Sequence, residues 1–145
     1  MTYLVTGSSG HLGEALVRVL RSKGEAVRSI DVKQGAFTDL VGHIADTDLV
    51  TTAMSGVRHV LHAATLHKPH VKTHSPQDFI DTNISGTQTL LDAAVRQGVE
   101  SFVFTSTTSA FGNALKPPQN QPAAWITETV TPQVKNIYGA TKLAA

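Results

Sequence analysis

The chain has 145 residues, a formal net charge of +1 and no cysteine. This length suits one domain with its own hydrophobic core, and the missing cysteines exclude disulfides and thiol chemistry. The near-zero charge and the dispersed basic residues argue against nucleic acid and anionic membranes as partners. No apolar run is long enough to span a bilayer and no leader-like segment opens the chain, so we expect a cytoplasmic protein.

The first expected element is a short apolar strand at residues 3–6, which runs directly into a turn spaced G-x-x-G-x-x-G. Apolar residues then recur at helical spacing over about 12–23, up to Gly24, a typical helix stop. Such a turn lets a diphosphate approach the backbone, where the following helix offers free N–H groups. An ordinary glycine turn without a ligand is the alternative. The expected diphosphate contacts are Gly7, Gly10, His11, Leu12 and Gly13.

A second expected strand at 26–30 ends at Asp31. This carboxylate follows the glycine turn at close to the ~20 residues expected for a group that accepts hydrogen bonds from an adenosine ribose. An acid at this position would repel a 2′-phosphate, which favours NAD over NADP, and the nearby Lys33 weakens that preference. The alternative for Asp31 is a solvated acid in a turn.

The rest of the chain alternates strand-like and helical patterns. This alternation predicts an α/β fold, a Rossmann-like, doubly wound parallel sheet with helices on both faces. Residues 1–145 would form one dinucleotide-binding domain, and the link between Asp31 and Val41 is too short for a full crossover helix. The further expected strands are 41–45, 58–62 and 101–105, and the further expected helices are 47–55, 77–97 and 136–145.

Two features stand out near the end of the chain. Residues 113–135 are rich in proline and predict a long ordered loop of the kind that often serves a site, with Trp125 as its expected anchor. The last expected helix has barely begun where the sequence stops. We therefore expect the front part of a longer protein, cut before a C-terminal substrate-binding part.

The strongest chemical signal is the pair Tyr138 and Lys142, which lie four residues apart and so share a helix face. An ammonium group near a phenol favours the phenolate, which makes Tyr138 a candidate proton donor or acceptor for a carbinol or carbonyl. The spacing alone is a common coincidence. The hydroxyl-rich stretch 105–109 follows an apolar strand and could supply a group that binds the reacting oxygen.

Together these motifs resemble the extended short-chain dehydrogenases/reductases of the NAD-dependent epimerase/dehydratase type, the group that contains UDP-glucose 4-epimerase. The resemblance covers nearly the whole chain, and the ordered co-occurrence of the motifs makes it specific. Two positions depart from the pattern, since Ala45 stands where glycine is frequent and Phe111 where tyrosine is usual. The motifs are Gly7/Gly10/Gly13, Asp31, Ile44–Asp46, Val60–Ala64, Asn83–Thr87, Phe102–Gly112 and Tyr138/Lys142.

The resemblance implies a role for each matching residue. Asp46 would contact the adenine amino group, His62, Ala63 and Ala64 would pass beside the cofactor, and Asn83 would support the strand ends near the site. Thr105, at the end of the expected strand 101–105, would lie on the side of the cofactor. The catalytic residues would be Thr107 on the substrate oxygen, Tyr138 as acid/base and Lys142 on the nicotinamide ribose, with Ser106 or Thr108 as alternatives to Thr107.

The implied activity is hydride transfer between NAD and a carbinol or carbonyl of a nucleotide-sugar or related substrate, ending in epimerisation, dehydration or oxidation. The resemblance also implies a homodimer formed through the helix at 77–97, whose wide apolar faces allow a second packing partner. A simple buried helix is the alternative. The rival interpretation is a non-catalytic dinucleotide-binding sensor or interaction module. A further alternative is an inert fragment.

A group of histidines follows the fourth expected strand. His67, His70 and His74 have a spacing that suits zinc on a helix, but Pro69 and Pro76 interrupt a helix and no carboxylate or cysteine completes a ligand set, so we expect no metal. The loop has two other interpretations. It is either a solvated basic loop or a segment in which His67 or Lys68 contacts an anionic substrate.

Overall fold

The computed structural model describes residues 1–145 and contains one five-stranded parallel sheet in the order β3-β2-β1-β4-β5. The expected α/β class and the alternation of elements are confirmed. Every crossover except the link from β2 to β3 places a helix on a face of the sheet, as is usual between parallel strands. The strands are β1 (Thr2–Thr6), β2 (Ala26–Asp31), β3 (Leu40–Val41), β4 (His59–His62) and β5 (Ser101–Phe104).

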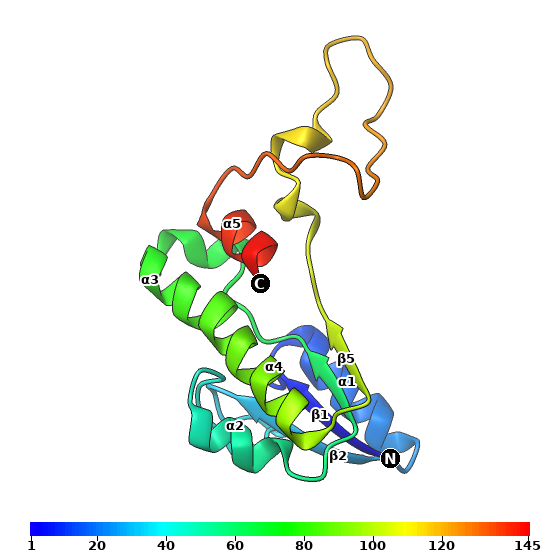
Figure 1. The fold of residues 1–145 in the computed structure, drawn as a ribbon, viewed down its shortest axis with the longest axis vertical. Helices are drawn as coiled ribbons and strands as arrows, with labels where there is room; N and C mark the ends of the chain where they lie inside the picture. The colour runs from blue at the N-terminus through cyan, green and yellow to red at the C-terminus, as the bar shows by residue number, and fades with distance from the viewer.

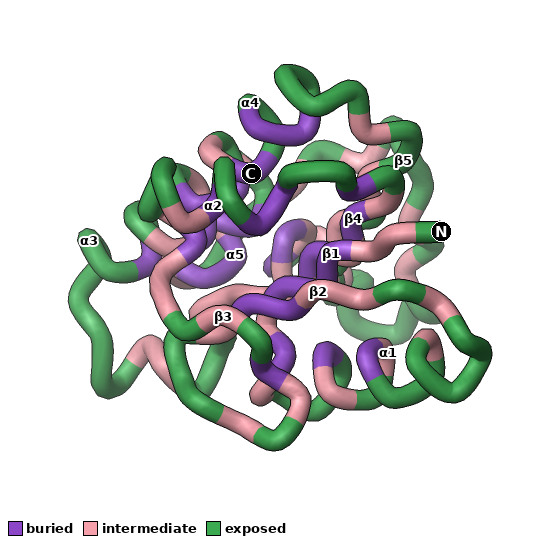
Figure 2. Tube along the Cα trace, turned by 90° about the horizontal axis from the view of Figure 1, so that it is seen from below, coloured by how far each residue is buried: buried purple, intermediate pink, exposed green.

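Helices cover both faces of the sheet. Helix α1 (His11–Ser22) packs on β1 and β2 from one side, while α2 (Thr47–Met54) and α4 (Gly86–Gln97) pack together on the other (Figure 2). The core lies on this second side, between α2, α4 and the sheet. Its fully buried side chains include Leu4, Ile30, Val50, Met54, Val60 and Leu90.

The expected helix at 77–97 is one helical run with an irregular centre. It consists of α3 (Pro76–Phe79), a π-helical segment η2 (Ile80–Ser85) and α4. Ser75 caps the start through a capping box with Asp78, and Gly98 ends the run with a left-handed backbone at φ +67°. The π-helical segment carries Asn83, and wide turns of this kind often occur at functional positions.

The third expected strand is much shorter than predicted. We expected 41–45, whereas β3 spans only Leu40 and Val41. The next residues turn towards α2 instead, because the amide of Asp46 donates to the carbonyl of His43 at 2.9 Å and Asp46 then caps the helix. The link from Asp31 to Leu40 contains no helix, as expected.

The segment between β5 and the last helix, α5 (Ile137–Ala144), is a long loop that projects from the body of the molecule (Figure 1). Its two ends are tied together, since the amide of Asn113 donates to the carbonyl of Gln133 at 2.8 Å. Trp125 was expected to anchor the loop, but its side chain is 90% exposed and anchors nothing. The short helices η1 (Lys68–Lys72), η3 (Thr108–Ala110) and η4 (Asn113–Leu115) complete the chain.

No helix of the structure combines the length and the apolar character that crossing a membrane requires.

Candidate active site

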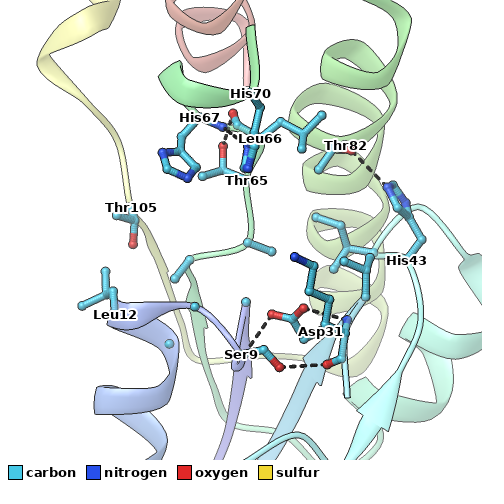
Figure 3. A pocket seen from close by; sticks show the side chains of 18 of the residues that line it. Ser9, Leu12, Asp31, His43, Thr65, Leu66, His67, His70, Thr82 and Thr105 are labelled. Carbon is cyan, nitrogen blue, oxygen red and sulfur yellow. Dashed lines mark hydrogen bonds between the residues drawn. The ribbon is translucent and has the colours of Figure 1, made fainter. Parts of the chain in front are cut away.

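A cavity of about 1000 Å³ opens at the carboxyl edge of the sheet. Its floor is built by the ends of neighbouring strands, with Gly7 after β1, Asp31 at the end of β2 and Thr105 after β5. His67 and His70 line the opposite side (Figure 3). Parallel sheets bind ligands at this edge, where the strand order reverses, and here the reversal lies between β1 and β4.

The glycine turn is shaped by close contact between backbones. Gly7 has a φ of +76°, and a Cβ there would lie 2.7 Å from the amide nitrogen of Ala64. A Cβ on Gly13 would collide with the carbonyl of Gly7. Helix α1 has no side-chain cap at Gly10, so its first N–H groups have no partner in the helix. His11, Leu12 and Gly13, which carry these groups, line the cavity.

Asp31 is held in place by backbone amides. Its Oδ2 accepts from the N–H of Ser9 at 2.9 Å, and its Oδ1 accepts from the N–H of Lys33 at 2.9 Å. The hydroxyl of Ser9 also donates to the carbonyl of Lys33 at 2.8 Å (Figure 3). Ser9, which no sequence pattern marks, ties the glycine turn to the end of β2. Both carboxylate oxygens keep lone pairs for ligand hydroxyls.

His62 lies at the centre of a buried chain of hydrogen bonds that the sequence analysis did not foresee. The Thr87 hydroxyl donates to the carbonyl of Asn83 at 2.7 Å, so its oxygen accepts from Nε2–H of His62 at 3.0 Å. Nδ1 of His62 then accepts from the Thr6 hydroxyl at 2.7 Å. The Thr6 oxygen in turn accepts from the N–H of Ala64 at 3.1 Å.

This chain of hydrogen bonds fixes His62 as a neutral imidazole. Burial, reinforced by the positive charge of Lys142, lowers the pKa of His62 to about 3. The network connects β1, β4 and α4 and holds Ala64 against Gly7. His62 therefore shapes the cofactor side of the cavity without contacting it.

Asn83 is a supporting residue of the same kind. Its Oδ1 accepts from Leu66 N–H at 2.8 Å and from the Thr65 hydroxyl at 2.9 Å. Its amide donates to the carbonyl of Leu66 at 2.9 Å and to the Thr141 hydroxyl at 3.0 Å. Asn83 thus joins the segment after β4 to α5, and its hydrogen-bonding capacity is used within the protein.

The predicted catalytic residues lie beside the cavity, and none of them forms its wall. Tyr138 and Lys142 lie on α5, where they are 8% and 4% exposed. Helix α5 packs against η3, the short helix that begins directly after Thr107. The ammonium of Lys142 lies 3.6 Å from the ring centre of Phe104, the last residue of β5. Burial lowers the pKa of Lys142 to about 8, which leaves the side chain protonated at neutral pH. The Thr107 hydroxyl accepts from Ser109 N–H at 3.2 Å.

Asp46 has a structural partner outside the cavity. Its Oδ1 accepts from the N–H groups of Asp48 and Leu49 at 3.0 and 3.1 Å, so it caps α2. The neighbouring Ile44 and Ala45 line the cavity, whereas Asp46 does not. Its contact with adenine stays a prediction.

The histidines after β4 form a row of neighbouring rings that meet edge-to-face or at a tilt. The ring centres of His67 and His70 lie 4.4 Å apart, and those of His70 and His74 lie 5.0 Å apart. Burial and the neighbouring charges of His67, His74 and Lys33 lower the pKa of His70. The N–H of His67 donates to Nδ1 of His70 at 3.1 Å. Pro69 does not interrupt a helix here, since it lies in the first turn of η1.

Comparisons with known proteins agree with this arrangement. The chain is 36% identical over 99% of its length to an uncharacterised protein of Sinorhizobium fredii, and 31% identical over 99% to the UDP-glucose 4-epimerase of Halalkalibacterium halodurans. It covers 35% and 44% of these two relatives, so it spans less than half of their length.

Solved structures show the same fold. A short-chain dehydrogenase/reductase superfamily protein of Agrobacterium tumefaciens with bound NAD matches 99% of this chain and 42% of its own, with a TM-score of 0.83 and 32% identity. The UDP-glucose 4-epimerase of Thermus thermophilus in complex with NAD matches 99% and 48%, with a TM-score of 0.81 and 27% identity. The model of the NAD dependent epimerase/dehydratase family matches residues 3–145. The chain therefore belongs to this family, among the extended short-chain dehydrogenases/reductases.

Proposed function

We propose that the protein is an NAD-dependent enzyme that acts on a carbinol or carbonyl of a nucleotide-sugar or related substrate, by epimerisation, dehydration or oxidation. The observation that carries the proposal is the single cavity that joins the uncapped start of α1, Asp31 and the end of β5. Family membership and relatives that are described with NAD or nucleotide-sugars support it.

The residues at the cavity fit a dinucleotide. The open N–H groups at the start of α1 suit a diphosphate, and the glycines leave room where side chains would collide. Asp31 would accept from the adenosine ribose hydroxyls, and its charge would disfavour a 2′-phosphate. Bound NAD would supply a hydride acceptor. Ala63, Ala64 and Thr105 would lie along it.

The reactive end would use the residues of α5 and the segment after β5. Tyr138 would hold or move the proton at its phenolic oxygen, and Thr107 would donate a hydrogen bond to the substrate oxygen. Lys142, protonated at neutral pH, would supply positive charge at the reactive end. In an epimerase or dehydratase the hydride returns to the substrate, whereas in a dehydrogenase it leaves as NADH.

The test compares the Tyr138→Phe variant with the wild-type protein, each at the full length that the gene encodes. We expect both to bind NAD with equal affinity in a calorimetric titration. We expect turnover of UDP-glucose and related sugar nucleotides to fall by roughly 100-fold or more in the variant, because the proton transfer is lost. Product analysis and NADH absorbance measure the turnover.

The control is Tyr3→Phe at the only other tyrosine, whose hydroxyl points to Met1 far from the cavity. It should retain full activity. Absence of NAD binding would overturn the proposal as a whole. Normal NAD binding with no turnover in any form of the protein would instead favour the non-catalytic sensor.

A further inference from the structure

A second, smaller hollow of about 200 Å³ lies beside the reactive end. It is formed where η1, η3, η4 and the residues before α5 meet. Its polar side chains are those of Lys68, Thr108, Ser109, Lys135 and Asn136. Thr108 and Ser109 directly follow Thr107, and Asn136, the N-cap of α5, lies two residues before Tyr138, so residues next to both proposed reacting groups line the hollow.

The hollow contains positive charge and no carboxylate. Lys68 and Lys135 both line it, and neither takes part in any salt bridge of the structure. The larger cavity differs, since Asp31, Asp78 and Asp81 line it together with Lys33. Two ammonium groups that line one small space without an acid raise the electrostatic energy of the empty hollow, and an anion lowers it.

The polar groups of the hollow are free donors. The Thr107 oxygen binds the amide of Ser109, and no side-chain hydrogen bond involves the hydroxyl of Thr108 or of Ser109. Asn136, which lines the hollow, accepts from Gly139 N–H through Oδ1 at 3.0 Å, and its side-chain NH2 donates no hydrogen bond within the protein. Ammonium, hydroxyl and amide donors around one space make up a set that binds carboxylate or phosphate oxygens.

We propose that this hollow binds an anionic group, a carboxylate or a phosphate, which the substrate carries close to the carbon that reacts at Tyr138. The inference rests on the proposed function and narrows its substrate class. Lys68 and Lys135 would hold the anion by charge, while Thr108, Ser109 and Asn136 would orient it. Sugars with a neutral substituent at that place leave the two ammonium groups uncompensated and bind more weakly.

The experiment measures binding of sugar nucleotides to the NAD-loaded protein by calorimetry. UDP-glucuronic acid and UDP-glucose share every group except a carboxylate in place of a hydroxymethyl. We expect the acid to bind about 10-fold tighter or more, as charge-assisted hydrogen bonds provide. Lys68→Met and Lys135→Met should each remove most of this preference while they leave the affinity for NAD and UDP-glucose unchanged.

Lys72→Met is the matched control, because Lys72 belongs to the same short helix η1 as Lys68 but does not line the hollow. It should keep the preference. Glucuronate and glucose 6-phosphate, each compared with glucose, form two further arms. A lysine-dependent gain for the first identifies the carboxylate as the ligand, and a gain for the second identifies the phosphate.

Three results would overturn the inference. The first is equal affinity for acidic and neutral sugars in every comparison. The second is a loss of affinity for acidic and neutral sugars alike in the lysine variants. The third is a loss of affinity for UDP alone that is as large in the lysine variants as the loss for UDP-glucuronic acid. The last result would assign the lysines to the diphosphate and not to a group beside the reacting carbon. NAD binding and the Tyr138→Phe effect on neutral sugar nucleotides are measured independently, so failure here leaves the proposed function standing.

Discussion

Single side chains in this molecule act on the cavity mainly by holding other groups in place. His62 and Asn83 are 1% and 2% exposed, and neither lines the cavity, yet their hydrogen bonds place the segment 63–66 against the glycine turn and α5. Buried polar networks of this kind specify one arrangement only when every member is satisfied. In this structure no buried side-chain polar atom lacks a partner.

The lowered pKa of His62 predicts a specific pH dependence of stability. The unfolded state takes up a proton near pH 6.5, whereas the folded state does so only near pH 3, so the free energy of unfolding falls as pH decreases between these values. The slope approaches about 1.4 kcal/mol per pH unit. Urea unfolding of His62→Asn should show this slope removed and a loss of roughly 1–3 kcal/mol at neutral pH.

Asparagine is the informative replacement because its oxygen can still accept from the Thr6 hydroxyl, while its short side chain cannot reach Thr87. His59→Gln serves as the control, since His59 lies at the other end of β4 and contacts Ser101 near the surface. An unchanged pH slope in His62→Asn would contradict the assignment of His62 as a buried neutral imidazole.

At the scale of elements, the shape of the β1–α1 turn depends on close packing of its backbone against the backbone of the segment after β4. The missing side chains at Gly7 and Gly13 are therefore required by contact, while the uncapped start of α1 stays open to the cavity. A strand–turn–helix unit elsewhere in the chain, β3 to α2, shows the contrast. There the carboxylate of Asp46 occupies the first amides of the helix.

Gly13→Ala tests the turn. The added methyl group would collide with the carbonyl of Gly7, so the turn must shift and displace the backbone that lines the cavity. We expect a loss of roughly 1–3 kcal/mol in stability and a weaker affinity for NAD of about 10-fold or more. Thermal unfolding and calorimetric titration measure the two effects.

Glu14→Ala is the neighbouring control. Glu14 pairs only with exposed Arg18 on the surface of α1, and such pairs contribute little to stability. It should bind NAD normally. A Gly13→Ala variant with unchanged NAD affinity would show that the turn does not hold the diphosphate.

At the scale of the whole molecule, the outer face of α4 exposes two apolar side chains among polar ones. Val95 is 82% exposed and Leu91 is 37% exposed, on the side of α4 that faces away from the core. We propose that this face joins two copies of the protein in a homodimer. In a twofold-symmetric dimer the same surface of each copy would form the interface. An exposed apolar pair on adjacent helical turns could form the centre of such an interface.

Light scattering after size-exclusion chromatography checks this proposal. Val95→Lys should shift the protein from dimer towards monomer, because the interface would have to bury two ammonium groups. Val19→Lys is the matched control, since Val19 is 51% exposed on α1, which covers the opposite face of the sheet. A monomeric unchanged protein, or equal effects of both variants, would contradict the α4 interface.

Local patterns were enough to predict most of the fold. The order and type of the elements follow from apolar periodicity, glycine turns and caps, and the expected ranges of α1 and α2 are correct within one residue at each end. The exception, β3, depends on where Asp46 begins a helix. Asp46 caps the start of α2, so the chain leaves the strand after Val41. The apolar periodicity of 41–45 does not encode this cap.

The sequence predicts those parts of the candidate site that belong to short local motifs. The glycine turn and Asp31 line one cavity as expected, and α5 carries Tyr138 and Lys142 next to the end of β5. The links from Ser9 to Asp31 and from Thr6 through His62 to Thr87 join residues far apart in the chain. Such pairings depend on the completed fold, so a single sequence gives no sign of them.

The position of β1 in the sheet has a consequence for how the protein folds. One neighbour of β1 is β2, which follows it closely in the chain, but the other is β4, and the hydrogen bond between Thr6 and His62 spans 56 residues. Closing such a long loop is slow relative to local pairing. The wall that Ala64 forms against Gly7 arises only in that late step. A nascent chain would thus acquire affinity for a dinucleotide abruptly, once β4 has docked, and not gradually as α1 forms.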